Sequence, residues 1–266
     1  MGIKKQLDDH LRDWQSRLSA VLHSRQAYFP GRFKSKQSNA TTQIYLEEPI
    51  CFSSLPLGNA KSHKERRVWA FINGRFETEG SEDGQRLTHF GASVTFFEAK
   101  PRARRFKLLD AFHFDYHPQR SVKSSPHSIF HVQRDVHWDE QQWRQSLQRG
   151  AFNEFQEYKF PTVHPGVLGA NFRLTRFRIP SPRLDIFGVI LVTTADMVIQ
   201  HDIVEHREAF DALLRLMEDE RNPLHALTCG LENLPLCFPH TESSSGRWYS
   251  KYHSFPRERD WADGPN

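Results

Sequence analysis

The sequence predicts an α+β protein in which an antiparallel β-sheet of about five to seven strands packs against helices. Segments of alternating apolar and polar residues follow one another between residues 68 and 137 with short turns between them, as in an antiparallel meander. An amphipathic pattern opens the chain, and mostly helical patterns occupy residues 139–220. The 21 Phe and 3 Met residues favour sheets packed on helices over a helical bundle.

The N-terminal segment predicts an amphipathic helix that begins at residue 3 and ends by residue 27. Its apolar side chains recur every three or four residues, so they share one face. We expect this face to lie on the core, and a role of the same helix in binding a protein partner stays open. The apolar residues are Ile3, Leu7, Leu11, Trp14, Leu18, Val21 and Leu22.

Four strands are expected in the sheet region, at residues 68–79, 88–98, 106–117 and 128–136. Within the first of them, Asn73-Gly74 predicts a tight turn or a β-bulge. The polar residues 30–42 are interpreted as a connection without regular structure.

The second half of the chain is expected to be more helical. Helices are predicted at residues 139–148, 184–200 and 204–220. The second is apolar enough to be buried all round, and a buried strand is the alternative there. A strand at 171–179 precedes Ser181-Pro182, which is typical of the start of a helix. We therefore predict one domain over residues 1–240, followed by a polar C-terminal tail at 241–266.

Composition narrows the class of protein. Cys51, Cys229 and Cys237 are too few for a disulfide framework and favour a reducing compartment. Neither a signal-peptide pattern nor a membrane-spanning run is present, so we expect a cytoplasmic protein with no membrane association. The net charge of +4 is compatible with nucleic acid as a partner. The motifs of nucleotide-driven motors, serine hydrolases and classical dehydrogenases are absent.

The candidate site is a group of histidines on two neighbouring predicted strands. On the strand at 106–117 the odd-numbered residues include His113, Asp115 and His117, and on the strand at 128–136 and just before it they include His127 and His131. If the strands pair around the loop at 118–126, His113 lies opposite His131 and His117 opposite His127, with their polar faces together.

Three interpretations of this face stay open. It can be a structural face whose imidazoles are solvated or hydrogen-bonded beneath a helix. It can bind zinc or manganese, with His113, Asp115 and His117 as the ligands. It can also be a metal-free pair of histidines that cleaves RNA by acid–base catalysis with the help of the RNA's own 2′-hydroxyl.

Two basic turns are candidates for contacts with nucleic acid. One contains Lys64, Arg66 and Arg67, and the other contains Arg102, Arg104 and Arg105. Such turns can hold phosphates, although solvated charge at the ends of strands gives the same pattern.

These features lead to two alternative functions. The first is a small cytoplasmic hydrolase of phosphodiesters, a nuclease or RNase effector of a bacterial defence or toxin–antitoxin system. The second is a non-catalytic binding or scaffold subunit of a protein or protein–nucleic-acid complex. The sequence does not decide whether the protein is an enzyme.

Overall fold

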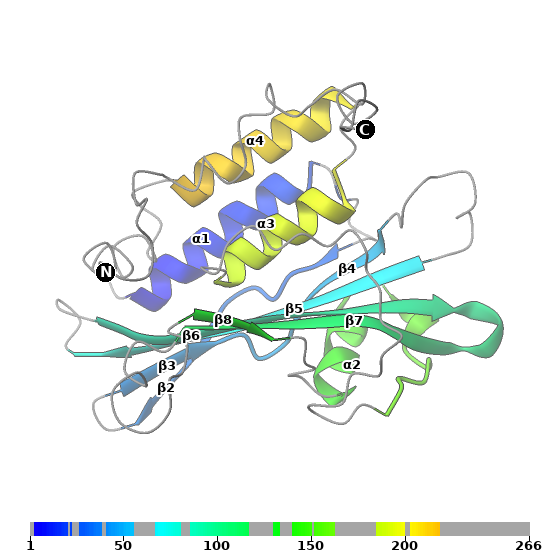
Figure 1. Ribbon diagram of the computed structural model, residues 1–266, viewed down its shortest axis with the longest axis horizontal. Helices are drawn as coiled ribbons and strands as arrows, with labels where there is room; N and C mark the ends of the chain where they lie inside the picture. Colours follow the sequence, from blue (N-terminus) through cyan, green and yellow to red (C-terminus); the bar gives the residue numbers. More distant parts are fainter. Residues whose placement is uncertain are drawn as a thin grey trace, which may run out of the picture.

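The computed structural model describes residues 3–20, 22, 27–38, 41–55, 67–80, 86–116, 130–133, 140–150, 152–162, 185–199 and 203–218. It confirms the predicted α+β class: an antiparallel sheet carries helices on both faces (Figure 1). The helices are α1 (Ile3–Leu18), α2 (Glu140–Arg149), α3 (Ile186–Met197) and α4 (Val204–Glu218), with short 3-10 turns η2 (Pro101–Ala103) and η4 (Asn153–Phe155). The strands are β1 (Ala27–Tyr28), β2 (Lys34–Ser38), β3 (Thr41–Tyr45), β4 (Ile50–Leu55), β5 (Arg67–Glu79), β6 (Arg86–Lys100), β7 (Arg105–Tyr116) and β8 (Phe130–Gln133).

The sheet follows one main path of six strands in the order β1-β4-β5-β6-β7-β8, and every pair in it is antiparallel. Strand β3 pairs with the second half of β5, and β2 pairs with β3. The long strands β5, β6 and β7 correspond to predicted strands, and helices α1 to α4 correspond to predicted helices.

The sheet starts well before residue 68, contrary to the prediction. Residues 30–42, which we interpreted as an irregular connection, contain β2 and the start of β3. Strand β2 has the sequence Lys-Ser-Lys-Gln-Ser and is mostly exposed, so it carries no apolar alternation. Backbone pairing with β3 defines it, and that pairing leaves no pattern in a single sequence.

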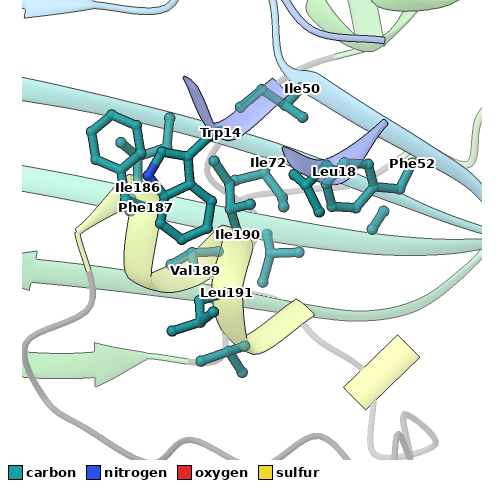
Figure 2. Packing of buried hydrophobic residues seen from close by; sticks show 14 of the residues in the cluster. Trp14, Leu18, Ile50, Phe52, Ile72, Ile186, Phe187, Val189, Ile190 and Leu191 are labelled. Carbon is teal, nitrogen blue, oxygen red and sulfur yellow. The ribbon is translucent and has the colours of Figure 1, made fainter. Parts of the chain in front are cut away.

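Helices α1, α3 and α4 cover one face of the sheet (Figure 1). Trp14 of α1 and Phe187 of α3 are fully buried, with ring centroids 5.7 Å apart, and Figure 2 shows them side by side. Helix α3 is apolar on all sides because it packs on β5 and β6 of the sheet, beside α1 and beneath α4 (Figure 1).

Gly74 lies inside a continuous strand, so the predicted turn or bulge at Asn73-Gly74 is wrong. Asn73 and Gly74 pair in regular register with Ser93 and Ala92. A Cβ atom at Gly74 would lie 2.8 Å from the Cβ of Ile186, closer than carbon atoms can approach. Glycine is needed here because α3 packs directly on the backbone of β5.

Helix α2 and turn η4 cover part of the opposite face, over a second core rich in aromatic rings (Figure 1). The hydroxyl of Ser146 in α2 donates to the Pro49 carbonyl at 2.7 Å, which fixes the helix to the loop before β4. Fully buried rings of the second core are Trp69, Phe71, Phe97, Phe106 and Trp143.

Strand β7 changes faces along its length, so its even-numbered residues from Phe106 to Phe114 do not share one core face, as uninterrupted alternation would predict. The register moves from Phe97↔Leu108 to Phe96↔Asp110, so Leu109 is an extra residue in β7. This bulge directs Phe106 and Leu108 into the second core, whereas Phe112 and Phe114 enter the first. Alternation alone cannot reveal it, because both faces are apolar at this end of the strand.

Several predictions lie outside the described residues: the strand at 171–179, Ser181-Pro182, and the tail at 241–266. Among the described helices, none is both long and apolar enough to cross a membrane.

Candidate functional site

Strands β5, β6 and β7 bring four titratable side chains together on the face that α2 only partly covers. The register places Glu77 opposite His89. It also places His113 and Asp115 opposite Ser93 and Gly91. Directly paired residues of antiparallel strands point to the same side, so these side chains form a polar strip beside the second core.

Asp115 is the centre of this strip and binds two imidazoles. Its Oδ2 lies 2.5 Å from Nε2 of His113, and its Oδ1 lies 3.3 Å from Nε2 of His89. The other ring nitrogen of His89, Nδ1, is 3.8 Å from Oε1 of Glu77. We call the group formed by Glu77, His89, His113 and Asp115 the histidine–aspartate network.

The network is largely shielded from water. The side chains of His89 and His113 are 3% and 5% exposed, whereas Asp115 is 13% and Glu77 32% exposed. Burial alone raises the pKa of Asp115, but the hydrogen bonds and attraction of His113 and His89 outweigh it and hold the pKa well below its usual range. Asp115 is therefore ionised at neutral pH, and the two Nε2 atoms facing it donate their hydrogens.

Gly91 provides the space in which the carboxylate lies. A Cβ atom there would be 2.8 Å from Oδ1 of Asp115, 3.6 Å from Nε of Arg75 and 3.7 Å from Cε1 of His89. A carboxylate, an imidazole and a guanidinium thus converge above one glycine, which is an arrangement suited to moving protons and holding negative charge.

The predicted pairing of His113 with His131 is wrong by two residues. The structure pairs Asp115 with His131 and His113 with Gln133. A slip of two keeps odd-numbered positions on one face, so the apolar pattern fits both registers and cannot choose between them. The odd-numbered positions of β7 and β8 do pair with one another, as expected.

The structure leaves part of the predicted site undescribed. His117, His127, Lys64 and Arg66 lie outside the described residues. For His131 and Arg67 it gives the backbone position in β8 and β5. Within the described ranges, no group of three or more His, Cys, Asp or Glu side chains is arranged to hold a metal ion, so His113 and Asp115 do not form such a group with a third described residue.

His89 and Glu77 are the members of the network that the sequence interpretation missed. Both lie on strands that were predicted, and the strand with His89 precedes the one with His113. Extending the search for odd-numbered polar residues from the hairpin to the strand before it would have found His89.

The second basic turn is exposed, as a surface for nucleic acid requires. Arg102, Arg104 and Arg105 lie in or beside η2, which joins β6 to β7. Arg104 has a left-handed backbone with φ 42° and its Nη1 lies 3.7 Å from Oε2 of the exposed Glu157. An exposed pair at that distance holds the arginine weakly, so its charge stays available.

No protein-family model matches the chain, and comparisons with curated proteins and with solved structures found no similar protein.

Proposed function

We propose that the protein is a hydrolase of phosphodiesters that uses the histidine–aspartate network for acid–base catalysis on RNA. The observation that carries the proposal is the pair of imidazoles bound to the single ionised carboxylate of Asp115. A carboxylate that accepts Nε2–H fixes the tautomer and orientation of a catalytic imidazole.

The chemistry follows from the orientation of the rings. Because Nε2 of each ring donates to Asp115, Nδ1 is the nitrogen left to exchange a proton with substrate. Both Nδ1 atoms are buried in the structure, so the mechanism requires this part of the sheet to open when RNA binds. One imidazole, neutral and unprotonated on Nδ1, would remove the proton of the 2′-hydroxyl, whose oxygen then bonds to phosphorus. The other, protonated on both nitrogens, would give its Nδ1 proton to the 5′-oxygen as the bond between that oxygen and phosphorus breaks. The guanidinium of Arg75, which also approaches Gly91, would offset the charge that develops on phosphorus oxygens.

The setting of this activity is also part of the proposal. The exposed turn with Arg102, Arg104 and Arg105 supports nucleic acid as the substrate. The sparse, odd set of cysteines supports a reducing cytoplasm, where an RNase would act as the effector of a bacterial defence or toxin–antitoxin system.

Cleavage of a single-stranded RNA oligonucleotide, with and without a chelator, tests the proposal. His113→Asn keeps a similar shape but cannot act as an acid or base, so we expect at least about a 100-fold loss of rate. His206→Asn on α4, on the other face of the sheet, is the matched control. Wild-type cleavage by a folded His113→Asn variant would rule out the mechanism. Activity lost to the chelator and restored by zinc or manganese would favour a metal site.

Near-complete burial of His89 and His113 favours a second candidate function, a non-catalytic binding subunit in which the network stabilises the sheet. Nucleic acid would then bind the exposed arginines. A protein partner at the N-terminal helix would meet its polar side, since Leu7, Leu11 and Trp14 are buried. RNA binding that is lost in Arg102→Ala/Arg104→Ala, with no cleavage in any variant, is the result this alternative predicts.

A further inference from the structure

A cavity of about 430 Å³ lies between strands β3 and β5 and helix α2. Its volume falls within the range of small-molecule sites, roughly 300–1,000 Å³. Its wall is mostly polar, which is unusual for a void that would only reflect imperfect packing of a core. The residues around it are Gln43, Tyr45, Arg75, Gln141, Gln142 and Gln145, with Leu46 and Glu47 at its margin.

Arg75 is the cation of this cavity, and it forms no ion pair with a described carboxylate, although the Asp115 carboxylate lies on the other side of Gly91. Its Nε atom is buried and has no hydrogen-bond partner among the described residues. A guanidinium is charged at every physiological pH, and a buried donor without an acceptor is unfavourable because it has lost its hydrogen bonds to water. An anion in the cavity would provide both the missing acceptor and the missing charge.

The remaining walls supply neutral donors. Helix α2 contributes the amides of Gln141, Gln142 and Gln145, and β3 contributes the phenol of Tyr45. The one carboxylate among these lining residues is Glu47, which is 57% exposed and lies 3.1 Å from Nζ of Lys34. Its negative charge is therefore balanced by Lys34 and not by Arg75.

Glu77 lies close to this wall, but its charge is also engaged. Its Oε1 accepts a hydrogen bond of 3.2 Å from Nε2 of Gln43, and it faces His89 on the other side. The cavity is therefore adjacent to the histidine–aspartate network and shares Arg75 with it, whereas its glutamine amides and the Tyr45 phenol belong to the cavity alone.

We propose that this cavity binds a phosphate group, either as the free ion or as part of a small molecule such as a nucleoside monophosphate. The forked guanidinium of Arg75 would hold two oxygens, and glutamine amides from the opposite wall would donate to the others. A tetrahedral phosphate can meet donors from both walls at once, which a planar carboxylate with two oxygens does less well. The proposal goes beyond the proposed function, because it concerns a ligand held without being cleaved.

Calorimetric titration of the whole protein tests this site. The probes are inorganic phosphate, each of the four nucleoside monophosphates, and malonate as a dicarboxylate. We expect saturable binding of phosphate or of a monophosphate, tighter than that of malonate. Arg75→Ala should weaken it about 10- to 100-fold, the usual loss for a charge-assisted hydrogen bond. Arg17→Ala removes the same charge from the exposed side of α1, on the other face of the sheet, and should leave affinity unchanged.

Gln145→Glu is the second variant, and it remains informative if Arg75→Ala does not fold. Its side chain is partly exposed on α2, and the new carboxylate would repel a phosphate in the cavity. Circular dichroism checks the fold of every variant. Absence of saturable phosphate binding in the wild type, preference for malonate, or unchanged affinity in Gln145→Glu would overturn the proposal. None of these readings depends on RNA cleavage, so failure here is distinct from failure of the proposed hydrolase.

Discussion

The carboxylate of Asp115 joins the two buried imidazoles of His89 and His113. Removing one partner from a buried ionic network lowers stability more than replacing the whole network with apolar side chains does, because the groups that remain are buried without their partner. Asp115→Asn should therefore lower the free energy of unfolding by about 2–4 kcal/mol near neutral pH. Urea denaturation of both proteins measures the difference.

The pH dependence of that difference has a definite sign. The folded-state pKa of Asp115 lies below its ordinary value, so its contribution to stability is present above about pH 4 and is lost as the pH falls further. The wild-type advantage should shrink in acid. Asp9→Asn is the control, because Asp9 pairs with Lys5 on the surface, where solvent screens the pair, and its loss should change stability little. Equal effects of the two changes would contradict the central role of Asp115.

Gly91 tests the geometry of the network without touching a titratable group. In Gly91→Ala the new methyl must push away the Asp115 carboxylate, which lies 2.8 Å from its position. We expect a lower melting temperature and shifted imidazole resonances in NMR spectra. Gly31→Ala is the matched control, since nothing lies within 4 Å of that site. A Gly91→Ala protein with wild-type stability and spectra would show that the Asp115 carboxylate can take another position without loss, which would contradict the geometry described for the network.

At the scale of elements, the start of α3 carries a carboxylate whose charge should lower stability, whereas the charge of Asp115 raises it. Asp185 caps this helix by accepting a 2.9 Å hydrogen bond from the Gly188 amide. Burial raises its pKa to about 6, against hydrogen bonds from the backbone of Gly188 and Phe187 that lower it. The folded state therefore binds the proton more tightly, and the charge of Asp185 destabilises the fold at neutral pH.

Asp185→Asn keeps the cap and removes the charge. It should be more stable than the wild type near pH 7.5, by at most about 3 kcal/mol, from about 1.4 kcal/mol per unit of pKa. The advantage should fall between about pH 6 and about pH 4, as the wild-type carboxyl becomes protonated. Denaturant titrations across this range measure it, and an asparagine variant that is less stable at every pH would contradict the assignment.

The elements also show why some structure was predictable and some was not. Helices α1 and α4 and strands β5 and β6 are long and periodic, so their patterns predict them. Strand β2 is short, polar and at an edge, and only its partner defines it. Apolar alternation likewise leaves the β7–β8 register open to shifts of two residues, and it hides the bulge at Leu109.

The candidate site follows the same rule. Alternation placed His113 and Asp115 on one face, which the structure confirms through their pairing with Ser93 and Gly91. Their contact with His89 depends on the next strand in the sheet, and therefore on tertiary register. The cavity at Arg75 depends on how α2 lies against β3, which no single-sequence pattern encodes.

At the scale of the whole molecule, the first and last described elements complete the same core. Helix α1 packs against α4, and both face α3 above the sheet (Figure 1). The core over this face therefore closes only when both ends of the described chain are in place. A helix used in this way is part of the folded unit, in contrast to a detachable arm that would bind a partner through its apolar face.

Leu11→Ala distinguishes these two roles of α1. Leu11 is 1% exposed in the first core, so truncation should lower the free energy of unfolding by about 2–5 kcal/mol. Val204→Ala on α4 is the control, since Val204 is 51% exposed and its truncation should have an effect within about 0.5 kcal/mol. If α1 closes the core, Leu11→Ala should also shift one cooperative transition, seen alike by tryptophan fluorescence and circular dichroism. A Leu11→Ala protein as stable as the wild type would instead identify α1 as a separable arm, and its apolar face would become the surface on which to search for a protein partner.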